Sequence, residues 1–322
     1  MSSCDINMKS IMVDKLVKQY KSGVRALNEL SLDVNRGEIF ALIGPNGAGK
    51  SSLINILNTF LSPTSGKVYV LGRDVKREQN YIRKHIACVS QQVSIDMHLS
   101  LNENMMFQSK LYKVDSSTAK NRINNLLEIF GLKQYLKYPV ASYSGGIKRR
   151  LDIAMNMMSH PEILFLDEPT VGMDVQSRKA MWDMMRKIRD EFGTTIFLTT
   201  HYLEEADELS DTICIMKDGH ELVQDSPKNL RRFIHQNMIR ITLSCKDKAQ
   251  KCAHDLSELS IIKALRLNGN VLYAYVNDCK NEFKELTRFL LEHEVDFISI
   301  EIAEASLEDV FLALTGKEEG RH

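Results

Sequence analysis

Short apolar runs recur through the longer, N-terminal part of the chain. Residues 39–43 (IFALI), 163–166 (ILFL) and 195–198 (TIFL) are continuous apolar runs, the pattern of strands that are covered on both faces. Residues 30–34 instead alternate apolar and polar side chains, as in a half-buried strand. A helix predicted over residues 174–192 separates the second and third runs. This alternation of strands and helices predicts an α/β fold with a parallel sheet.

The stretch from about residue 78 to residue 160 has a different character. It is more polar, and its pattern is mainly helical. Asp115 stands before one predicted helix as a capping residue, and Gly131 follows the end of that helix. We therefore expect a helical subdomain between the first and second apolar runs.

The pattern changes again after Ser226-Pro227. The remaining residues predict the order β-α-β-β-α-β of a small α+β, ferredoxin-like domain, followed by a last helix. Its predicted elements are residues 238–243, 246–259, 261–267, 271–276, 281–294 and 297–302, and the last helix covers 306–314. The sequence thus predicts two domains, residues 1–228 and 229–322.

Composition limits the possible functions. The 322 residues include 42 Lys+Arg and 42 Asp+Glu, and this balance gives no support to a nucleic-acid binder, which normally has a basic surplus. No apolar run approaches the roughly 18–20 residues that cross a bilayer, and the first ten residues contain no apolar signal core. We expect no direct insertion into a membrane. The six cysteines show no paired or zinc-binding spacing.

A glycine-rich segment follows the first apolar run directly. Residues 44–51 (GPNGAGKS) fit G-x-x-x-x-G-K-[ST], with a predicted buried strand before them and a helix after them. Glycines let backbone N–H groups curve around phosphate oxygens. Lys50 is expected to contact the β- and γ-phosphates, and Ser51 to bind Mg²⁺. The predicted nucleotide-binding residues here are Gly44, Pro45, Asn46, Gly47, Ala48, Gly49, Lys50, Ser51 and Ser52. An ordinary glycine-rich turn is the alternative, but motif and context agree.

Two carboxylates end the second apolar run. Asp167 follows residues 163–166, and Glu168 comes directly after it. Asp167 is well placed to hold Mg²⁺, and a neighbouring free carboxylate can orient or deprotonate an attacking water. Either acid alone could be a capping residue at a strand end. Both together, downstream of a phosphate loop, favour a catalytic pair.

These features resemble the ATP-binding subunit of ABC transporters, over about residues 8–225. The resemblance implies a P-loop ATPase with an antiparallel β subdomain and a helical subdomain. It further implies that Tyr20 stacks on adenine and that Gln91 touches Mg²⁺. It also implies that Asp174, in VGMD, lies in a loop that crosses to a partner subunit, and that His201 contacts the γ-phosphate. Taken singly, Tyr20 could be a packed aromatic and His201 a satisfied polar residue.

The segment YSGGIKRRL resembles the signature motif of the same family. In that family the signature of one subunit completes the ATP site of another, so Ser144, Gly145 and Gly146 are expected to face the ATP of a second copy. A helix N-terminus suits an anion. The alternative is a simple serine N-cap followed by two flexible glycines. We expect Lys148, Arg149 and Arg150 to form a solvated face.

Details of these motifs resemble exporters of the daunorubicin-resistance type. Tyr143 and Ile147 replace the more usual Leu and Gln of the signature, and the tail SLEDVFLALTG (306–316) is similar to that subset. The resemblance implies a homodimer, or a dimer with a related ATPase subunit, that binds ATP and Mg²⁺. It also implies that this dimer drives a separate integral membrane permease at the cytoplasmic face of the membrane. It also implies that Met97 and Leu99 contact this permease, and that the C-terminal domain stabilises or regulates the dimer.

Two other classes of protein compete with this interpretation. A soluble ABC-type ATPase of repair or translation would share the motifs, but such proteins usually have a long coiled-coil insertion or two nucleotide domains. A GTPase or small-molecule kinase would leave Ser144–Gly146, Gln91 and His201 unexplained, and no N-K-x-D guanine motif is found. The sequence does not indicate what is transported.

Overall fold

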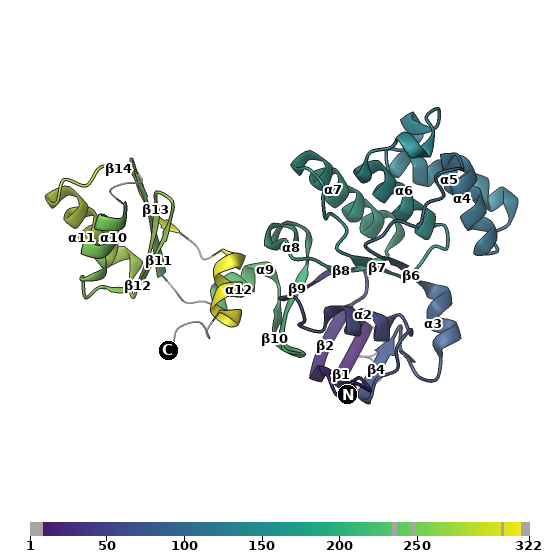
Figure 1. Ribbon diagram of the computed structural model, residues 1–322, viewed down its shortest axis with the longest axis horizontal. Coiled ribbons are helices and arrows are strands. Elements are labelled where there is room, and N and C mark those ends of the chain that lie inside the picture. The colour runs from purple at the N-terminus through teal and green to yellow at the C-terminus, as the bar shows by residue number, and fades with distance from the viewer. Residues whose placement is uncertain (1–8, 234–236, 246–248, 304–305, 317–322) are drawn as a thin grey trace. The chain divides into compact units, whose positions relative to one another are not determined.

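The strands of the described residues form three sheets, two in the N-terminal part of the chain and one near its C-terminus (Figure 1). The computed structural model describes residues 9–233, 237–245, 249–303 and 306–316. The chain divides into two units, Met1–Pro227 and Lys228–His322, one residue before the predicted boundary.

The central sheet of the first unit has the order β10-β9-β3-β8-β7-β6. Its strands are β3 (Ile39–Ile43), β6 (Ile86–Val89), β7 (Ile163–Asp167), β8 (Thr195–Thr199), β9 (Thr212–Lys217) and β10 (His220–Asp225). Neighbouring strands are parallel from β9 to β6, and β10 pairs with β9 in a hairpin that turns at Asp218-Gly219. The predicted parallel α/β sheet is confirmed, and β3, β7 and β8 are the three predicted apolar runs.

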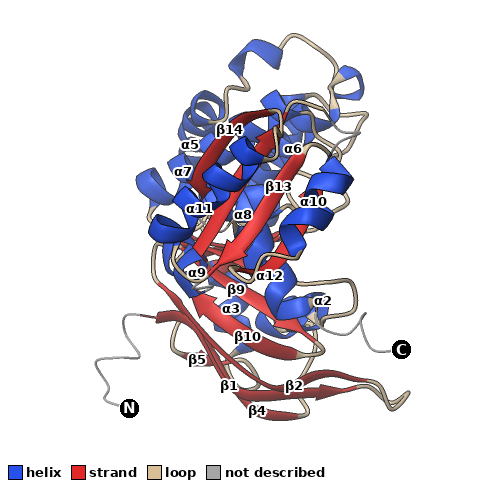
Figure 2. Cartoon of the chain, turned by 90° about the vertical axis from the view of Figure 1, so that its left-hand side faces the viewer, coloured by secondary structure: helices blue, strands red, loops and turns tan. Residues whose placement is uncertain are grey.

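A smaller sheet of the order β2-β1-β4-β5 is antiparallel (Figure 2). Its strands are β1 (Lys9–Gln19), β2 (Arg25–Asn35), β4 (Ser65–Val70) and β5 (Arg73–Asp74). Apolar residues of β1, β2 and β4 share one buried core with helix α2 (Lys50–Leu57) and with Phe40, Phe165 and Phe197 of the central sheet. The antiparallel sheet therefore packs on one face of the central sheet, with α2 in the same core.

Helices cover the other face of the central sheet and continue beyond its edge (Figure 1). They are α4 (Leu101–Leu111), α5 (Ser116–Ile129), α6 (Gly145–Met157), α7 (Val175–Phe192) and α8 (Leu203–Leu209), with short 3₁₀ turns at Lys133–Tyr135 and Val140–Ser142. Helix α3 (Gln79–His85) lies instead on the side of the antiparallel sheet, because its Ile82 belongs to the core of that sheet. Helices α3 to α6 occupy the region predicted to be helical, and Asp115 caps α5 as expected. Among the residues that the structure describes, no helix is both long enough and apolar enough to cross a membrane.

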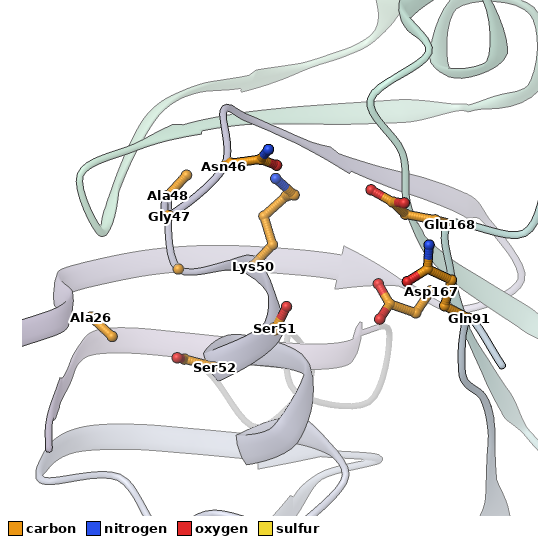
Figure 3. Close-up of a pocket in the computed structure, with 11 residues that line it drawn as sticks. Ala26, Asn46, Gly47, Ala48, Lys50, Ser51, Ser52, Gln91, Asp167 and Glu168 are labelled. Carbon is orange, nitrogen blue, oxygen red and sulfur yellow. The ribbon is translucent and has the colours of Figure 1, made fainter. Parts of the chain in front are cut away.

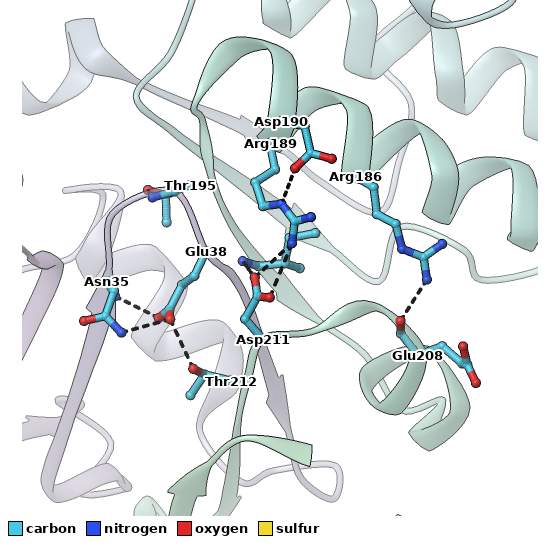
Figure 4. A network of polar contacts seen from close by, with 11 residues as sticks. Asn35, Glu38, Arg186, Arg189, Asp190, Thr195, Glu208, Asp211 and Thr212 are labelled. Carbon is cyan, nitrogen blue, oxygen red and sulfur yellow. Dashed lines mark hydrogen bonds and ion pairs between the residues drawn. The ribbon is translucent and has the colours of Figure 1, made fainter. Parts of the chain in front are cut away.

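Polar side chains hold the central sheet at the ends where its strands begin (Figure 4). Glu38, directly before β3, accepts hydrogen bonds from the side chain of Asn35 (3.0 Å) and the hydroxyl of Thr212 (3.1 Å). Asp211, directly before β9, accepts from the backbone N–H of Ile39 (2.8 Å) and from Arg189 of α7 (3.1 Å). These bonds hold the starts of β3 and β9 together and tie α7 to them. They therefore also fix the register of these strands at their carboxyl ends.

The second unit has one antiparallel sheet of the order β12-β13-β11-β14. Helix α9 (Pro227–Phe233) leads into it. The next elements are β11 (Asn237–Leu243), α10 (Ala249–Ser257), β12 (Ile262–Asn268), β13 (Val271–Val276), α11 (Cys279–Glu292), β14 (Phe297–Ala303) and α12 (Leu307–Thr315). Helices α10 and α11 share a buried core with one face of the sheet. The order β-α-β-β-α-β is the predicted one, although residues 246–248, the predicted start of α10, lie outside the described residues.

We predict that Phe197→Ala lowers the free energy of unfolding by about 3–5 kcal/mol, the usual cost of removing a buried aromatic ring. Phe197 is fully buried, with its ring centroid 5.0 Å from that of Phe40 and 5.5 Å from that of Phe165. Urea denaturation measures the change. Phe60 is 70% exposed, so Phe60→Ala is the control and should shift the free energy by less than about 0.5 kcal/mol. Equal effects of the two variants would contradict this packing.

Candidate nucleotide-binding site

The phosphate loop, residues 44–51, runs from β3 into α2, and two glycines let it pass close to other backbone. A Cβ on Gly44 would lie 2.4 Å from the carbonyl oxygen of Met216. Gly49 has φ of 102°, and a Cβ there would lie 2.4 Å from the carbonyl oxygen of Ala26. Any larger residue would push the loop off β2 and β9. Glycine at both positions therefore gives the loop its curvature.

Lys50, the first residue of α2, bends back over this loop. Its Nζ donates to the carbonyl oxygens of Gly44 (2.6 Å) and Pro45 (3.0 Å). Burial lowers the pKa of Lys50, and the negative charges of Glu168 and Asp167 oppose that shift. The ammonium group thus stands between the loop and two carboxylates, where it can balance the charge of a phosphate.

A cavity of about 410 Å³ lies in front of the loop (Figure 3). Lys50 and Ser51 stand on one side of it, and Gln91, Asp167 and Glu168 stand on the other. The lining residues are Ala26, Asn46, Gly47, Ala48, Gly49, Lys50, Ser51, Ser52, Gln91, Asp167 and Glu168. All of them except Ala26 were predicted from the sequence. Ala26 is a small apolar residue of β2, and no chemical pattern marks it.

The two carboxylates at the end of β7, Asp167 and Glu168, are held differently. Oδ1 of Asp167 accepts a hydrogen bond of 2.5 Å from the hydroxyl of Thr199, at the end of β8. Glu168 has φ of 46°, a left-handed conformation that is uncommon for a residue with a side chain. Its backbone N–H donates to the carbonyl oxygen (3.1 Å) and to the hydroxyl (3.2 Å) of Thr199. Thr199 therefore fixes both acids. No sequence pattern marks Thr199, because its hydroxyl acts only across the sheet.

His201 lies beside Glu168 rather than in the cavity wall. Its Nδ1 is 3.1 Å from Oε1 of Glu168, a distance that suits donation from the ring to the carboxylate. Helix α8 follows His201, and its Glu205 is fully buried. Glu205 accepts from the hydroxyl of Thr170 (2.8 Å) and the indole N–H of Trp182 (3.1 Å). These bonds anchor α8 to the segment that follows Glu168, so His201 and Glu168 are positioned together.

Tyr20 is joined to the cavity through Ser52. The hydroxyl groups of these two residues are 2.9 Å apart. Nζ of Lys18 lies 5.3 Å from the ring centroid of Tyr20, and 37% of Tyr20 remains exposed. An aromatic ring therefore stands at the outer end of the phosphate loop with surface available for stacking.

The other predicted site residues gather elsewhere. Ser144 and Gly146 line a second cavity, of about 270 Å³, that shares no lining residue with the first; its other residues are Tyr135, Ile147, Arg150, Gln176, Ser177 and Ala180. Asp174 caps α7 by accepting from the N–H (2.9 Å) and hydroxyl (2.7 Å) of Ser177. A Cβ on Gly146 would lie 3.5 Å from the Ser177 side chain. The structure thus divides the predicted residues into two separate groups.

Ser144 differs from the serine and aspartate caps of neighbouring helices. It is the N-cap residue of α6, yet its side chain accepts no hydrogen bond from its own helix. The side chains that cap α4, α5 and α7 all do so. A Cβ added at Gly145 would meet nothing within 4 Å. The beginning of α6 therefore presents a hydroxyl group that its own helix does not use.

The expectation of a solvated face after Ser144 is wrong for Arg149. Arg149 is only 4% exposed. It lies on the side of α6 that packs against the ends of β6 and β7, because its guanidinium group finds backbone carbonyl oxygens there. Sequence periodicity places a charged residue on the surface by default, and here the packing of the helix overrides that default.

Comparison with known proteins identifies the family. The family model described as ABC transporter matches residues 27–171. The daunorubicin/doxorubicin resistance ATP-binding protein DrrA of Streptomyces peucetius is 36% identical over 309 residues, which are 96% of this chain and 93% of that protein. The chain belongs to the ABC transporter family. It is an ATP-binding and ATP-hydrolysing subunit of that family, and its first unit is an ABC ATPase domain.

Further relatives agree with this assignment. The Nod factor export ATP-binding protein I of Ralstonia nicotianae is 31% identical, over 96% of this chain and 94% of that protein. The structure of cbiO1 from Clostridium perfringens, part of the ABC transporter complex cbiONQ, matches with a TM-score of 0.65 and 28% identity over 69% of this chain and 90% of that one. A dimeric ATP-binding cassette in a post-hydrolysis state, bound to ADP and Pi, matches with a TM-score of 0.59 and 25% identity over 67% of this chain and 98% of that one.

We predict that Thr199→Val slows ATP hydrolysis by about 10–100-fold, a typical effect of losing a group that orients a ligand of a metal site. Valine keeps the shape but removes the hydroxyl that holds Asp167 and Glu168. ATP affinity, measured by fluorescence titration, should not change. Thr195→Val is the matched control on the same strand, because its hydroxyl bonds Ser10 and Gly37. Wild-type turnover by Thr199→Val would contradict this positioning.

Proposed function

We propose that this ABC ATPase powers an exporter through a separate membrane permease, and that it does so by closing a head-to-tail homodimer on two ATP molecules. The observation that carries the proposal is the division of the site into two groups that share no residue. The phosphate loop with Gln91 and the two carboxylates is one half-site. The start of α6 is the other half-site, and a second copy of the chain supplies it.

The start of α6 suits the γ-phosphate of an ATP held by the facing copy. Helix α6 has 13 residues, and its first N–H groups carry the positive end of the helix dipole. The unused hydroxyl of Ser144 adds a donor, and Gly145 and Gly146 let a phosphate approach the backbone. A two-fold axis places both such contacts in one interface, as closed dimers require.

The residues of the first half-site suit hydrolysis of ATP. Glu168 orients and deprotonates the attacking water, and His201, held 3.1 Å from Glu168, contacts the γ-phosphate. Tyr20 stacks on adenine, with its hydroxyl joined to Ser52. Asp174 and the segment before it form the contact with the partner copy.

The donor set of the same half-site suits Mg²⁺. Ser51, Gln91 and Asp167 offer a hydroxyl, an amide and a carboxylate oxygen around one cavity, and hard oxygen ligands are those that Mg²⁺ prefers. Within the described ranges, no three His, Cys, Asp or Glu residues gather into a metal-binding group. Mg²⁺ usually combines one or two carboxylates with nucleotide phosphates and water. Bound there, the ion would neutralise the phosphate charge.

The permease contacts the surface beside Gln91 and places the chain at the cytoplasmic face of the membrane. Met97 is 37% exposed and Leu99 is partly exposed. Phe107 of α4 is 54% exposed. Flexible and aromatic side chains suit a protein contact. Two relatives are named for daunorubicin resistance and Nod factor export, which supports export as the direction of transport.

The C-terminal unit stabilises or regulates the dimer. The match with the Streptomyces relative covers 96% of the chain, so that relative includes this part as well. The unit has its own core, and an ion pair of 3.0 Å between Arg266 and Asp309 holds α12 to β12. A separately folded module of this kind can act on the dimer without entering the nucleotide site.

We predict that Glu168→Gln abolishes turnover but keeps ATP binding, so that the chain becomes a stable dimer in Mg-ATP. The amide cannot accept the proton of water, and the closed state persists because hydrolysis no longer opens it. Light scattering after size exclusion, with and without Mg-ATP, measures the dimer. The same experiment on Glu168→Gln with Ser144→Ala tests the facing-copy contact.

The added Ser144→Ala change should weaken the dimer and leave ATP binding by the monomer unaltered. A monomer of Glu168→Gln at saturating Mg-ATP would contradict the closed-dimer mechanism. A loss of monomer affinity that matches the loss of dimer would place Ser144 in the site of its own subunit.

We predict that the chain purifies from gently solubilised membranes of its own host with a multi-span permease in equal amount. Mass spectrometry and quantitative gel analysis measure the identity and the ratio. A soluble chain without a membrane protein would contradict the transport function. It would instead favour a soluble ABC-type ATPase.

A further inference from the structure

Two charged residues of α6 are buried where this helix meets the central sheet. Arg149 is 4% exposed and Asp152 is 1% exposed, and Nη1 of Arg149 lies 3.7 Å from Oδ2 of Asp152. Neither residue lines the nucleotide cavity. They stand on α6, the helix that follows its N-cap residue Ser144.

The guanidinium group of Arg149 joins the ends of two neighbouring strands. Nη1 donates to the carbonyl oxygen of Ser90, directly after β6, and Nη2 donates to the carbonyl oxygen of Asp167 at 2.9 Å. Ser90 precedes Gln91, and Asp167 precedes Glu168. One side chain of α6 therefore holds the backbone beside Gln91, which is proposed to contact Mg²⁺, and beside Glu168, which is proposed to contact water.

Asp152 holds the other end of the segment that contains Gln91. Its Oδ1 accepts from the hydroxyl (2.7 Å) and the backbone N–H (3.4 Å) of Ser94. Residues 90–94 are exposed between these two anchors. The Gln91 segment, residues 90–94, is thus fastened to α6 at both of its ends.

Stability does not explain a buried pair of this kind. Burial lowers the pKa of Arg149 and raises the pKa of Asp152, which means that burial disfavours both charges. Replacing such pairs by apolar residues is often neutral or stabilising, and their best-attested use is to fix the register of packed elements. The register fixed here is that of α6 against the ends of β6 and β7.

We propose that the Arg149–Asp152 pair couples the two ATP sites of the dimer. This inference rests on the proposed head-to-tail dimer. ATP bound by one subunit draws in Gln91 and Asp167, and the pair moves α6 of the same subunit with them. The start of α6 faces the ATP of the partner, so occupation of one site favours closure of the other. Arg149 and Asp152 are positioning residues, since neither touches the nucleotide.

Cooperativity of ATP hydrolysis tests this role, because a purely structural role would leave it unchanged. The Hill coefficient of the full-length wild type is expected near 2, the number of sites. The double variant Arg149→Leu/Asp152→Leu removes the bonds without leaving one charge buried alone. We expect its Hill coefficient to fall to about 1, while ATP affinity of the monomer is retained.

A second variant keeps the test valid if the double variant does not fold. Arg149→Lys keeps a charge opposite Asp152, but one ammonium group cannot reproduce a fork that reaches the carbonyls of both Ser90 and Asp167. We expect the same loss of cooperativity. Arg122→Met is the matched control, since Arg122 donates to the carbonyl oxygen of Met158 at the far end of α6, away from the Gln91 segment.

The outcomes separate this inference from the proposed function. A dimer of Glu168→Gln in Mg-ATP, together with an unchanged Hill coefficient in Arg149→Lys, would overturn the coupling and leave the dimer mechanism in place. A Hill coefficient of 1 for the wild type would also overturn the coupling. Loss of cooperativity in Arg122→Met would show that any weakening of helix packing has this effect. That result would contradict a specific role of Arg149 and Asp152. Absence of the Glu168→Gln dimer would instead contradict the proposed function itself.

Discussion

The meeting of four parallel strand ends is the constraint on which the nucleotide site depends. Strands β3, β8, β7 and β6 are neighbours in the central sheet and run in the same direction, so their carboxyl ends meet at one edge. The phosphate loop, His201 and Gln91 follow the ends of β3, β8 and β6, and Asp167 is the last residue of β7. At the opposite edge, Glu38 and Asp211 hold the starts of β3 and β9. The register of one sheet thus sets the spacing of these residues.

A single subunit contains two features that suit an anion, the phosphate loop and the start of α6. The phosphate loop opens on one cavity, and the start of α6 opens on another with no residue in common. Dimerisation is a direct way to use both, because two-fold symmetry brings each feature of one copy to the complementary feature of the other. In the proposed head-to-tail dimer, such a site exists only while the dimer is closed. ATP binding and hydrolysis can then act as the signal that closes and opens the dimer.

Much of the nucleotide site could be predicted because its motifs are local. The fold of residues 44–51 depends on glycines within the loop, and the apolar runs at 39–43, 163–166 and 195–198 define the strands around it. The contributions of Ala26 and Thr199 could not be predicted. Ala26 enters the cavity from β2, and Thr199 holds Asp167 across β7 and β8. Both depend on pairing between segments that are far apart in the chain.

The family, the phosphate loop and the order of the sheet-forming segments can be read from the sequence, because hydrophobic periodicity and short-range motifs encode local structure. Which side chains meet depends on the folded chain. It separated Ser144 from Lys50 and buried Arg149, which charge alone would place in solvent. The reason is that Arg149 finds its acceptors on the backbone of Ser90 and Asp167. Carbonyl groups are present at every residue, so a sequence pattern cannot indicate which of them a packed helix will reach.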